Sequence, residues 1–145
     1  MSNIDSYFTL IKRLNILIEA HVNHSIQEYD MTMSQGAIIY QLINAPEKML
    51  PLKQLEQGLK LSQPVTAGIV KRLEEKGFIQ SLTDPNDRRV KIVKPTELAE
   101  SKLMSARKSM LELESELLSC YSQDDKQQFG KYLLELKENI ETKWR

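Results

Sequence analysis

The segment that decides the fold is residues 61–79, LSQPVTAGIVKRLEEKGFI. Ser62 is a favourable N-cap for a helix, and Pro64 stands in the first turn, where a missing N–H leaves no hydrogen bond unmade. Gly77 supplies the left-handed residue that commonly ends a helix. Four apolar residues at helical spacing form the stripe that we expect to be buried: Val65, Ile69, Val70 and Leu73. The segment therefore predicts a helix over residues 62–76.

The hydrophobic period changes from about 3.6 residues to about 2 directly after this helix. Residues 78–83, FIQSLT, alternate, residues 84–87, DPND, favour a turn, and residues 89–94, RVKIVK, alternate again. This pattern predicts a two-stranded hairpin with a charged tip. We expect Val90 and Ile92 to face the core. The side chains expected to face solvent are Arg89, Lys91 and Lys94.

Helical periodicity predicts three helices before this segment, over residues 4–29, 33–44 and 51–60. The residues expected to cap or open them are Asn3 or Asp5, Ser34 and Pro51. The side chains expected to be buried are Ile38, Ile39, Leu42 and Ile43 in the second helix and Leu52, Leu55 and Leu59 in the third. Two more helices are predicted after the hairpin, one capped by Thr96 and running to about residue 121, the other beginning at Ser122.

The terminal helices carry more apolar surface than a thin domain between them would cover. Exposing apolar surface costs about 25 cal/mol per Å², so we expect a second copy of the chain to cover it. The predicted fold is mainly α with a small β-hairpin. It is a winged helix-turn-helix over residues 33–95, with dimerisation helices over residues 1–30 and 96–145, in a single domain of residues 1–145.

Basic charge is concentrated in the middle of the chain, although the whole chain has a formal net charge of +0. Residues 50–95 carry nine Lys or Arg and five Asp or Glu, a net charge of +4, and the remainder carries 11 basic and 15 acidic residues, a net charge of −4. A basic segment between acidic ends is expected when that segment meets phosphate.

The predicted helix over residues 62–76 has an open face suited to DNA. In a helix-turn-helix the second helix enters the major groove. The side chains on this face are of types that contact bases or phosphates: Ser62, Gln63, Thr66, Ala67, Lys71 and Arg72. Gly68 weakens the helix by about 1 kcal/mol relative to alanine, which suggests that a phosphate backbone or another helix packs closely there. The alternative is a plain solvated helix face.

The predicted hairpin tip places Arg88 and Arg89 on a protruding loop. Arginine suits a narrow minor groove, where the negative potential is enhanced. Asp87 is placed to brace one arginine by a charge-assisted hydrogen bond. The alternative is a solvated charged turn.

The two runs over residues 61–79 and 84–96 resemble the recognition helix and the wing of MarR-type transcriptional regulators, and the helix order matches over nearly the whole chain. The resemblance implies a homodimer that binds a palindromic operator in double-stranded DNA, with the first, fifth and sixth helices intertwined. It implies that Arg89, paired with Asp87, enters the minor groove. The DNA-binding residues that it implies are Ser62, Gln63, Pro64, Thr66, Ala67, Lys71, Arg72, Asp87, Arg88 and Arg89.

Many members of this family bind a small aromatic effector between the dimer helices and the winged helix. The residues expected to line such a cleft are Tyr7, His21, Met33 and Tyr40, which are equally good core residues. His21 and His24, with Glu28 a turn later, have a spacing that can hold a metal, but the chain has only two His, and a solvated or interface-facing pair is the favoured interpretation. We therefore expect no metal and no cofactor.

The sequence does not favour an enzyme. It has no phosphate-cradling glycine loop and no nucleophile with a plausible base. The single cysteine, Cys120, is expected to be buried and structural. The opening residues lack the pattern of a signal peptide, and no apolar run approaches the length of a membrane helix, so we expect a cytoplasmic protein. The predicted function is a sequence-specific repressor released by a small effector. The alternative is a winged helix reused as a protein-interaction module or anti-regulator.

Overall fold

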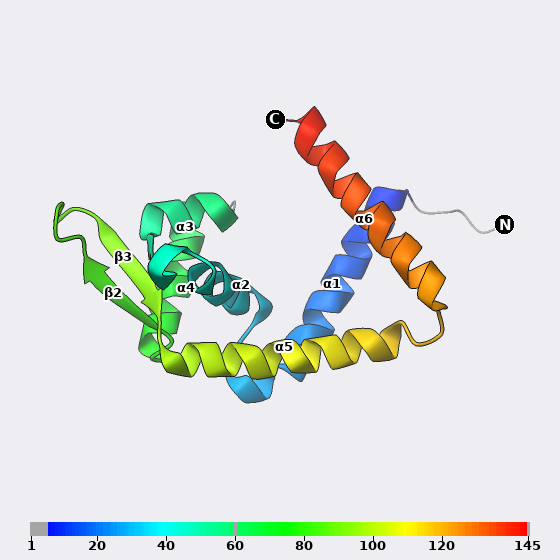
Figure 1. Ribbon diagram of the computed structural model, residues 1–145, viewed down its shortest axis with the longest axis horizontal. Helices are drawn as coiled ribbons and strands as arrows, with labels where there is room; N and C mark the ends of the chain where they lie inside the picture. The colour runs from blue at the N-terminus through cyan, green and yellow to red at the C-terminus, as the bar shows by residue number, and fades with distance from the viewer. Residues whose placement is uncertain (1–5, 60, 145) are drawn as a thin grey trace. The chain divides into compact units, whose positions relative to one another are not determined.

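The computed structural model describes residues 6–59 and 61–144 (Figure 1). It divides into two compact units, residues 1–110 and residues 111–145, which are described separately below. The predicted start of the first helix, with Asn3 or Asp5 as its cap, lies outside the described residues. The same is true of residue 60, the predicted end of the third helix.

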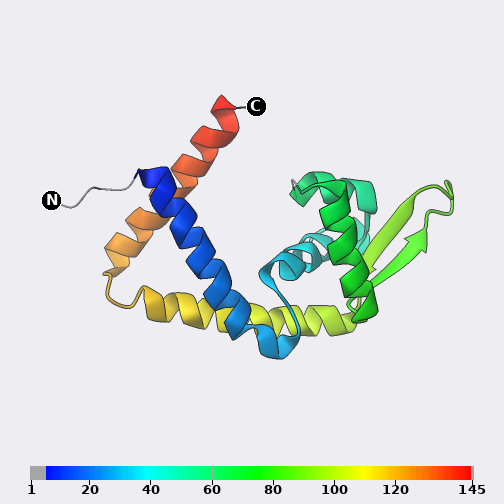
Figure 2. The ribbon, with the colours of Figure 1, turned by 180° about the vertical axis from the view of Figure 1, so that it is seen from behind.

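The first unit contains the predicted winged helix-turn-helix. Its elements, in chain order, are α1 (Tyr7–Ser25), the 3-10 helix η1 (Gln27–Tyr29), α2 (Met33–Ile43), the 3-10 helix η2 (Pro46–Lys48), β1 (Leu50–Pro51), α3 (Leu52–Leu59), α4 (Gln63–Glu75), β2 (Ile79–Thr83), β3 (Lys91–Pro95) and the first part of α5 (Glu97–Leu117). The β2–β3 hairpin extends beyond helices α2, α3 and α4, as the two opposite views in Figures 1 and 2 show. The mainly helical fold class predicted from the sequence is confirmed.

The chain turns between α1 and α2 earlier than predicted. Helix α1 ends at Ser25, and Asp30 follows η1 in the left-handed conformation, with φ of 54°. The N-cap of α2 is Thr32, whose side chain accepts from the backbone N–H of Gln35 while the Gln35 side chain accepts from the Thr32 N–H. The prediction of Ser34 as the cap is wrong, because this reciprocal pair satisfies two N–H groups at once.

The sheet has a third strand that the sequence pattern does not predict. The strand order is β1-β3-β2, and Leu50 pairs with Val93 across the antiparallel β1–β3 ladder. Pro51 is therefore the second residue of an edge strand, where its missing N–H is tolerated, and α3 begins at Leu52 instead of Pro51. In α3 only Leu55 is fully buried, and the prediction that Leu52 and Leu59 are also buried is wrong, because a short helix lying on one surface buries a narrow stripe.

The core lies between helices α2, α3 and α4 and one face of the sheet. Its fully buried side chains are Ile38, Ile39, Leu42, Leu55, Thr66, Val70, Leu73 and Val93. Val93 faces this core, whereas Val90 and Ile92 are partly exposed, as is Ile43 at the end of α2. The prediction that Val90 and Ile92 face inward is wrong, because successive residues of a strand point to opposite faces of the sheet. In β3 the residue that points into the core is Val93, the neighbour of Ile92.

Helix α5 begins as predicted and is fixed to the winged helix at its start. Thr96 Oγ1 accepts from the N–H of Ala99 at 3.2 Å and donates to the carbonyl of Gly77 at 2.7 Å. The Tyr29 hydroxyl lies 3.1 Å from Ser109 Oγ, which connects η1 to α5.

The second unit contains the end of α5 and helix α6 (Gln123–Lys143). Ser122 is the N-cap of α6, as predicted, and accepts from the N–H of Asp125 at 3.1 Å. Helix α5 ends at Leu117, earlier than predicted, so Cys120 lies in the intervening turn. Cys120 is exposed, and the prediction that it is buried is wrong for this reason.

Apolar side chains remain exposed along the terminal helices. In α1, Val22 is the buried residue, and the exposed large apolar side chains are Tyr7, Phe8, Leu10, Ile11, Leu14, Ile16, Leu17 and Ile18. In α6 they are Phe129, Tyr132, Leu133, Leu134 and Ile140. Despite this apolar character, no helix among the described residues is both long and apolar enough to cross a membrane.

Candidate nucleic-acid interface

Helix α4 buries a different stripe from the one that the sequence pattern predicts. Its buried residues are Thr66, Val70 and Leu73, and Thr66 is 0% exposed, whereas Val65 is 49% exposed. The predictions that Thr66 lies on the open face and that Val65 is buried are therefore wrong. A stripe beginning at Thr66 fits helical spacing as well as one beginning at Val65, and a threonine methyl group packs in a core where a count of apolar residues alone places valine.

The open side of α4 carries the other predicted contacts. Its exposed residues include Ser62, Gln63, Pro64, Ala67, Lys71 and Arg72. Gly68 lies among them, and no other part of the described chain approaches within 4 Å of a Cβ placed there. Packing of another helix of this unit therefore does not explain Gly68. Glu75 is also exposed on α4, so this side is not uniformly basic.

The end of α4 is fixed by its own backbone. Gly77 has φ of +75°, the N–H of Phe78 donates to the carbonyl of Leu73 at 2.8 Å, and the N–H of Gly77 donates to the carbonyl of Glu74 at 3.0 Å. These two bonds form the Schellman motif, and Leu73 and Phe78 are both buried beside it. The predicted stop at Gly77 is confirmed, and it directs the chain into β2.

The wing tip contains the predicted brace between Asp87 and Arg89. Arg89 Nε donates to Asp87 Oδ1 at 3.1 Å, Arg89 Nη2 donates to Asp87 Oδ2 at 3.3 Å, and the Arg89 backbone N–H donates to Oδ1 at 3.0 Å. These bonds from the Arg89 side chain, and then from its backbone, hold the pKa of Asp87 below its ordinary value. The Arg89 side chain nevertheless remains 90% exposed, so the brace orients it without covering it.

Glu74 connects α4 to both strands of the wing. Its carboxylate accepts from Ser81 Oγ in β2 and lies 3.1 Å from Lys91 Nζ in β3. Helix α4 and the base of the wing are therefore linked by an ion pair and a hydrogen bond that share the carboxylate of Glu74. The Lys91 ammonium also offsets the negative charge of Glu74 on this side of the helix.

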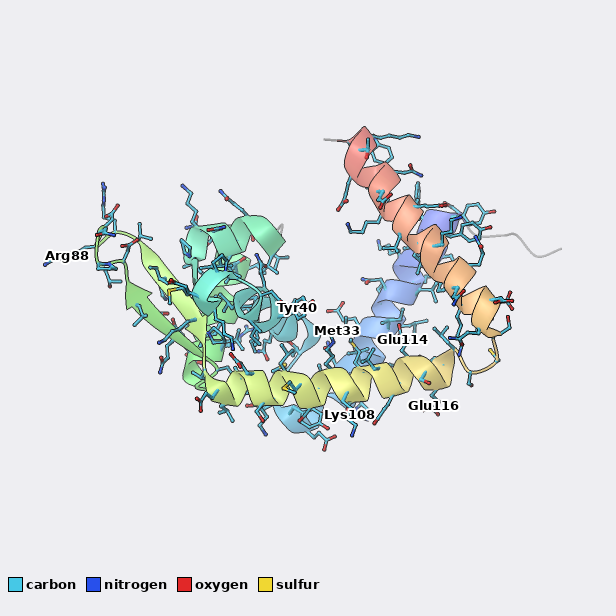
Figure 3. The ribbon with its side chains drawn as sticks, in the orientation of Figure 1. Met33, Tyr40, Arg88, Lys108, Glu114 and Glu116 are labelled. Atoms are coloured by element: carbon cyan, nitrogen blue, oxygen red, sulfur yellow. The ribbon has the colours of Figure 1, made fainter. Side chains whose placement is uncertain are left out.

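Two exposed basic groups thus belong to one unit. Lys71 and Arg72 lie on α4, and Arg88 and Arg89 lie on the wing. Figure 3 shows Arg88 at the wing tip, pointing away from the helices. A helix with exposed polar and basic side chains beside a protruding basic hairpin can contact a major groove and a neighbouring minor groove together.

Among the described residues of the single chain, the four predicted effector contacts do not line the hollow that lies in this unit. Tyr7 is 78% exposed on α1, His21 is exposed, and Met33 and Tyr40 lie on α2 (Figure 3). The Tyr40 ring instead has the Arg107 guanidinium 5.4 Å from its centroid. A hollow of about 350 Å³ in this unit is lined by Asn23, His24, Gln27, Asp30, Met31, Thr32 and Lys76, which include none of the four.

Polar groups elsewhere in the described chain offer little further chemistry. His21 and His24 are both exposed on α1, and the described residues contain no group of three or more His, Cys, Asp or Glu placed to hold a metal ion. Thr66 Oγ1 is buried without a hydrogen-bond partner in this part of the chain. Its hydroxyl lies in the core and not on the candidate interface.

Sequence patterns missed three residues of this region. Val65 is exposed on α4, Glu74 connects α4 to the wing, and Lys76 bonds to Asp30 and Gln35 far back along the chain. Comparing the two possible apolar stripes of α4 would have indicated the first. The other two depend on contacts between distant segments, for which the sequence carries no local signal.

Comparison with known proteins places this architecture in a family. Residues 31–91 match the model of the MarR family. The chain is 30% identical over 114 residues to the uncharacterized HTH-type transcriptional regulator YwoH of Bacillus subtilis, an alignment that covers 79% of this chain and 81% of that protein.

Solved structures share the fold. A MarR structure superposes with a TM-score of 0.84 at 21% identity, covering 97% of this chain and 94% of that one. The MepR–DNA complex of S. aureus superposes with a TM-score of 0.81 at 19% identity, covering 94% and 99%. A mutant MarR of E. coli complexed with operator DNA gives 0.76 at 21% identity, covering 88% and 91%. The matched family model and the similarity to YwoH show that this chain belongs to the MarR family of transcriptional regulators.

Proposed function

We propose that this protein binds a palindromic DNA operator sequence-specifically as a homodimer, with α4 in the major groove and the wing in the minor groove. The observation that carries the proposal is a pair of exposed basic groups on two linked elements. Lys71 and Arg72 lie on α4, and Arg88 and Arg89 lie on the wing. Glu74 of α4 links the two elements through its contacts with the wing strands. The two structurally similar proteins that hold DNA support this assignment.

The contacts on DNA follow from the exposed side chains. The proposed major-groove contacts are Ser62, Gln63, Pro64, Val65, Ala67, Lys71 and Arg72. Val65 and Ala67 supply apolar surface suited to a thymine methyl group, and Gln63 supplies an amide that can pair with adenine. Arg89, oriented by Asp87, is the proposed minor-groove contact.

The exposed apolar faces of α1 and α6 support the homodimer. A monomer rarely exposes contiguous apolar patches of this extent, because covering them lowers the free energy. A homodimer also provides two copies of α4 for a palindromic operator. We further propose that the protein represses transcription in the cytoplasm and that a small effector releases it, as in relatives of this family.

The proposal is tested by fluorescence anisotropy with the DNA upstream of the protein's own gene, at several salt concentrations, with unlabelled random DNA as competitor. Binding that resists the competitor and falls steeply with salt is expected. Arg89→Ala is expected to weaken this binding by at least about 1 kcal/mol without unfolding the protein. Lys131→Ala, which removes an exposed lysine from α6, is the control.

A duplex selected from a random pool replaces the upstream DNA if the operator lies elsewhere. If neither DNA binds even at low salt, the proposal is refuted, and a protein-interaction module becomes the better assignment. If the protein binds but Arg89→Ala leaves the affinity unchanged, the wing is removed from the proposed contacts.

A further inference from the structure

Lys76 connects the end of α4 to the turn that follows α1. It is the C-cap residue of α4, and its Nζ donates to the backbone carbonyl of Asp30 at 2.7 Å and to Gln35 Oε1 at 3.1 Å. The same nitrogen lies 3.2 Å from Asp30 Oδ1. The ammonium group of Lys76 therefore makes two hydrogen bonds and one ion pair with these two residues. The Lys76 side chain is only 24% exposed.

The acceptors of Lys76 are themselves fixed. Asp30 has the left-handed backbone conformation, which holds its carbonyl in a defined direction in the turn between α1 and α2. Gln35 is 6% exposed, and its Oε1 also accepts from the N–H of Thr32 at 3.2 Å in the cap of α2. The two hydrogen bonds of Lys76 are therefore made to a backbone carbonyl and to a buried side chain.

A buried aromatic ring supports the same ammonium group. The Phe78 ring centroid lies 5.9 Å from Lys76 Nζ, and Phe78 is 2% exposed at the start of the wing. A cation over a ring face at this distance is attracted by the ring quadrupole. Lys76 is thus held between the turn after α1 and the residue that leads from α4 into β2.

The connection continues into α1. Asn23 Oδ1 in α1 accepts from the N–H of Met33 at the start of α2 at 2.8 Å. The chain of hydrogen bonds therefore runs from α1 through the cap of α2 to the C-terminal end of α4. It joins the helix that carries the exposed apolar face to the helix that carries the proposed DNA contacts.

We propose that Lys76 is a positioning residue that fixes the angle between α1 and α4, and thereby the separation of the two recognition helices in the dimer. This inference rests on the proposed function, in which α1 belongs to the dimer interface. Along B-DNA each base pair advances the helix by about 3.4 Å and rotates it by about 34°. A small change in the angle therefore moves α4 out of register with one half-site.

The first experiment measures the separation of the two α4 helices without DNA. A spin label is placed on the exposed position 67 in an Ala67→Cys, Cys120→Ser background, and the inter-protomer distance is measured by pulsed dipolar spectroscopy. Lys76→Met, which keeps the apolar stem and removes the ammonium, is expected to broaden the distance distribution. Asp30→Asn keeps the backbone acceptor and should broaden it less. If the methionine variant does not fold, Lys76→Gln replaces it.

A distribution that Lys76→Met leaves as narrow as before would overturn the inference while leaving the dimer intact. The absence of any dipolar signal would refute the dimer, and with it both the proposed function and this inference. Because the measurement contains no DNA, failure to bind an operator does not affect its outcome.

The second experiment measures spacing preference on DNA. A duplex selected from a random pool is compared with the same duplex carrying one base pair inserted at its centre, and the original protein is expected to prefer the first at least tenfold. Lys76→Met should reduce this preference to less than threefold. Lys71→Met, a change of the same residue type on the exposed side of α4, should weaken binding to both duplexes and keep the preference. If Lys76→Met also keeps the preference, Lys76 has only a stabilising role, and the inference is wrong.

Discussion

Gly68 within α4 and Gly77 just after it have similar space around them and different backbone conformations. Apart from the adjacent residues and the backbone of its own helix, no described atom lies within 4 Å of a Cβ added at Gly68 or Gly77. Only Gly77 has a positive φ, of +75°. A side chain at Gly77 therefore meets backbone strain alone, and a side chain at Gly68 meets none. The pair therefore isolates the effect of backbone conformation, because the space around the two positions is similar.

Gly68→Ala is expected to stabilise the protein by about 0.5–1 kcal/mol, because alanine loses less backbone entropy in a helix. Gly77→Ala is expected to destabilise it by about 1–2 kcal/mol, because the left-handed conformation is costly for a residue with a Cβ. Urea denaturation at one fixed protein concentration measures both. A destabilising Gly68→Ala would contradict the open space seen around this position.

The same Gly68→Ala variant bears on DNA contact. If the groove approaches this part of α4 closely, a more stable protein should bind its operator less tightly, which a purely structural effect would not produce. This combination would support the first of the two sequence-based explanations of Gly68, a phosphate backbone that lies close to it.

The brace between Asp87 and Arg89 determines a pH dependence at the wing. Because the pKa of Asp87 is held below its ordinary value of 3.8, the brace contributes fully above that value and is lost as the pH falls through the lowered one. We expect the carboxyl-carbon NMR titration of Asp87 to have its midpoint below 3.8. In Arg89→Gln the midpoint should move up toward the ordinary value. Equal midpoints in the two proteins would show that the brace does not persist in solution.

At the scale of elements, the wing depends on which residues of β3 face the core. Val93 pairs with Leu50 of β1 on one side and with Ser81 of β2 on the other. It therefore lies in the central strand of the sheet, and 0% of its surface is exposed. Val90 lies outside the paired strand and is partly exposed. The same residue type therefore occurs in two environments three positions apart.

Val93→Thr is expected to lower the free energy of unfolding by about 1–3 kcal/mol, because it places a hydroxyl group in the core. Val90→Thr makes the same chemical change and is expected to alter stability by less than about 0.5 kcal/mol. Thermal and urea denaturation of the two variants compare them directly. Equal losses would favour the inward-facing Val90 that the sequence pattern predicts.

At the scale of the whole molecule, the exposed apolar face of α1 supports the proposed dimer. Leu14 and Leu17 are 43% and 56% exposed in the single chain, together with six other large apolar residues of this helix. In the proposed dimer a partner covers this face. A charge introduced there must then be desolvated without a partner, which is strongly unfavourable.

Leu14→Glu is expected to shift the protein from dimer to monomer in sedimentation-velocity experiments at micromolar concentration. Asn15→Glu adds the same carboxylate at the next position of α1, where a polar residue already stands, and should leave the dimer intact. Dimers of unchanged stability in Leu14→Glu would show that this face of α1 is not the interface.

The sequence by itself determined the helices, the two strands of the hairpin and their order. Local signals were sufficient where a residue acts on its own neighbours: Gly77 ends α4, Thr96 and Ser122 cap the helices after them, and Asp87 braces Arg89 two positions away. These interactions depend on short-range geometry, which the order of residues fixes. The basic residues of the wing and of α4 were identifiable for the same reason.

Only the tertiary structure decided which face of each element is buried and what distant segments share. In α4 Thr66 is buried in place of Val65, and in β3 the buried residue is Val93 instead of Val90 and Ile92. The helical and strand periods each allow more than one buried stripe, and the packing partner selects one of them. β1 forms only because β3 accepts it, and Lys76 finds its acceptors 46 and 41 residues away. Such choices depend on contacts between segments, and these exist only once the chain has folded.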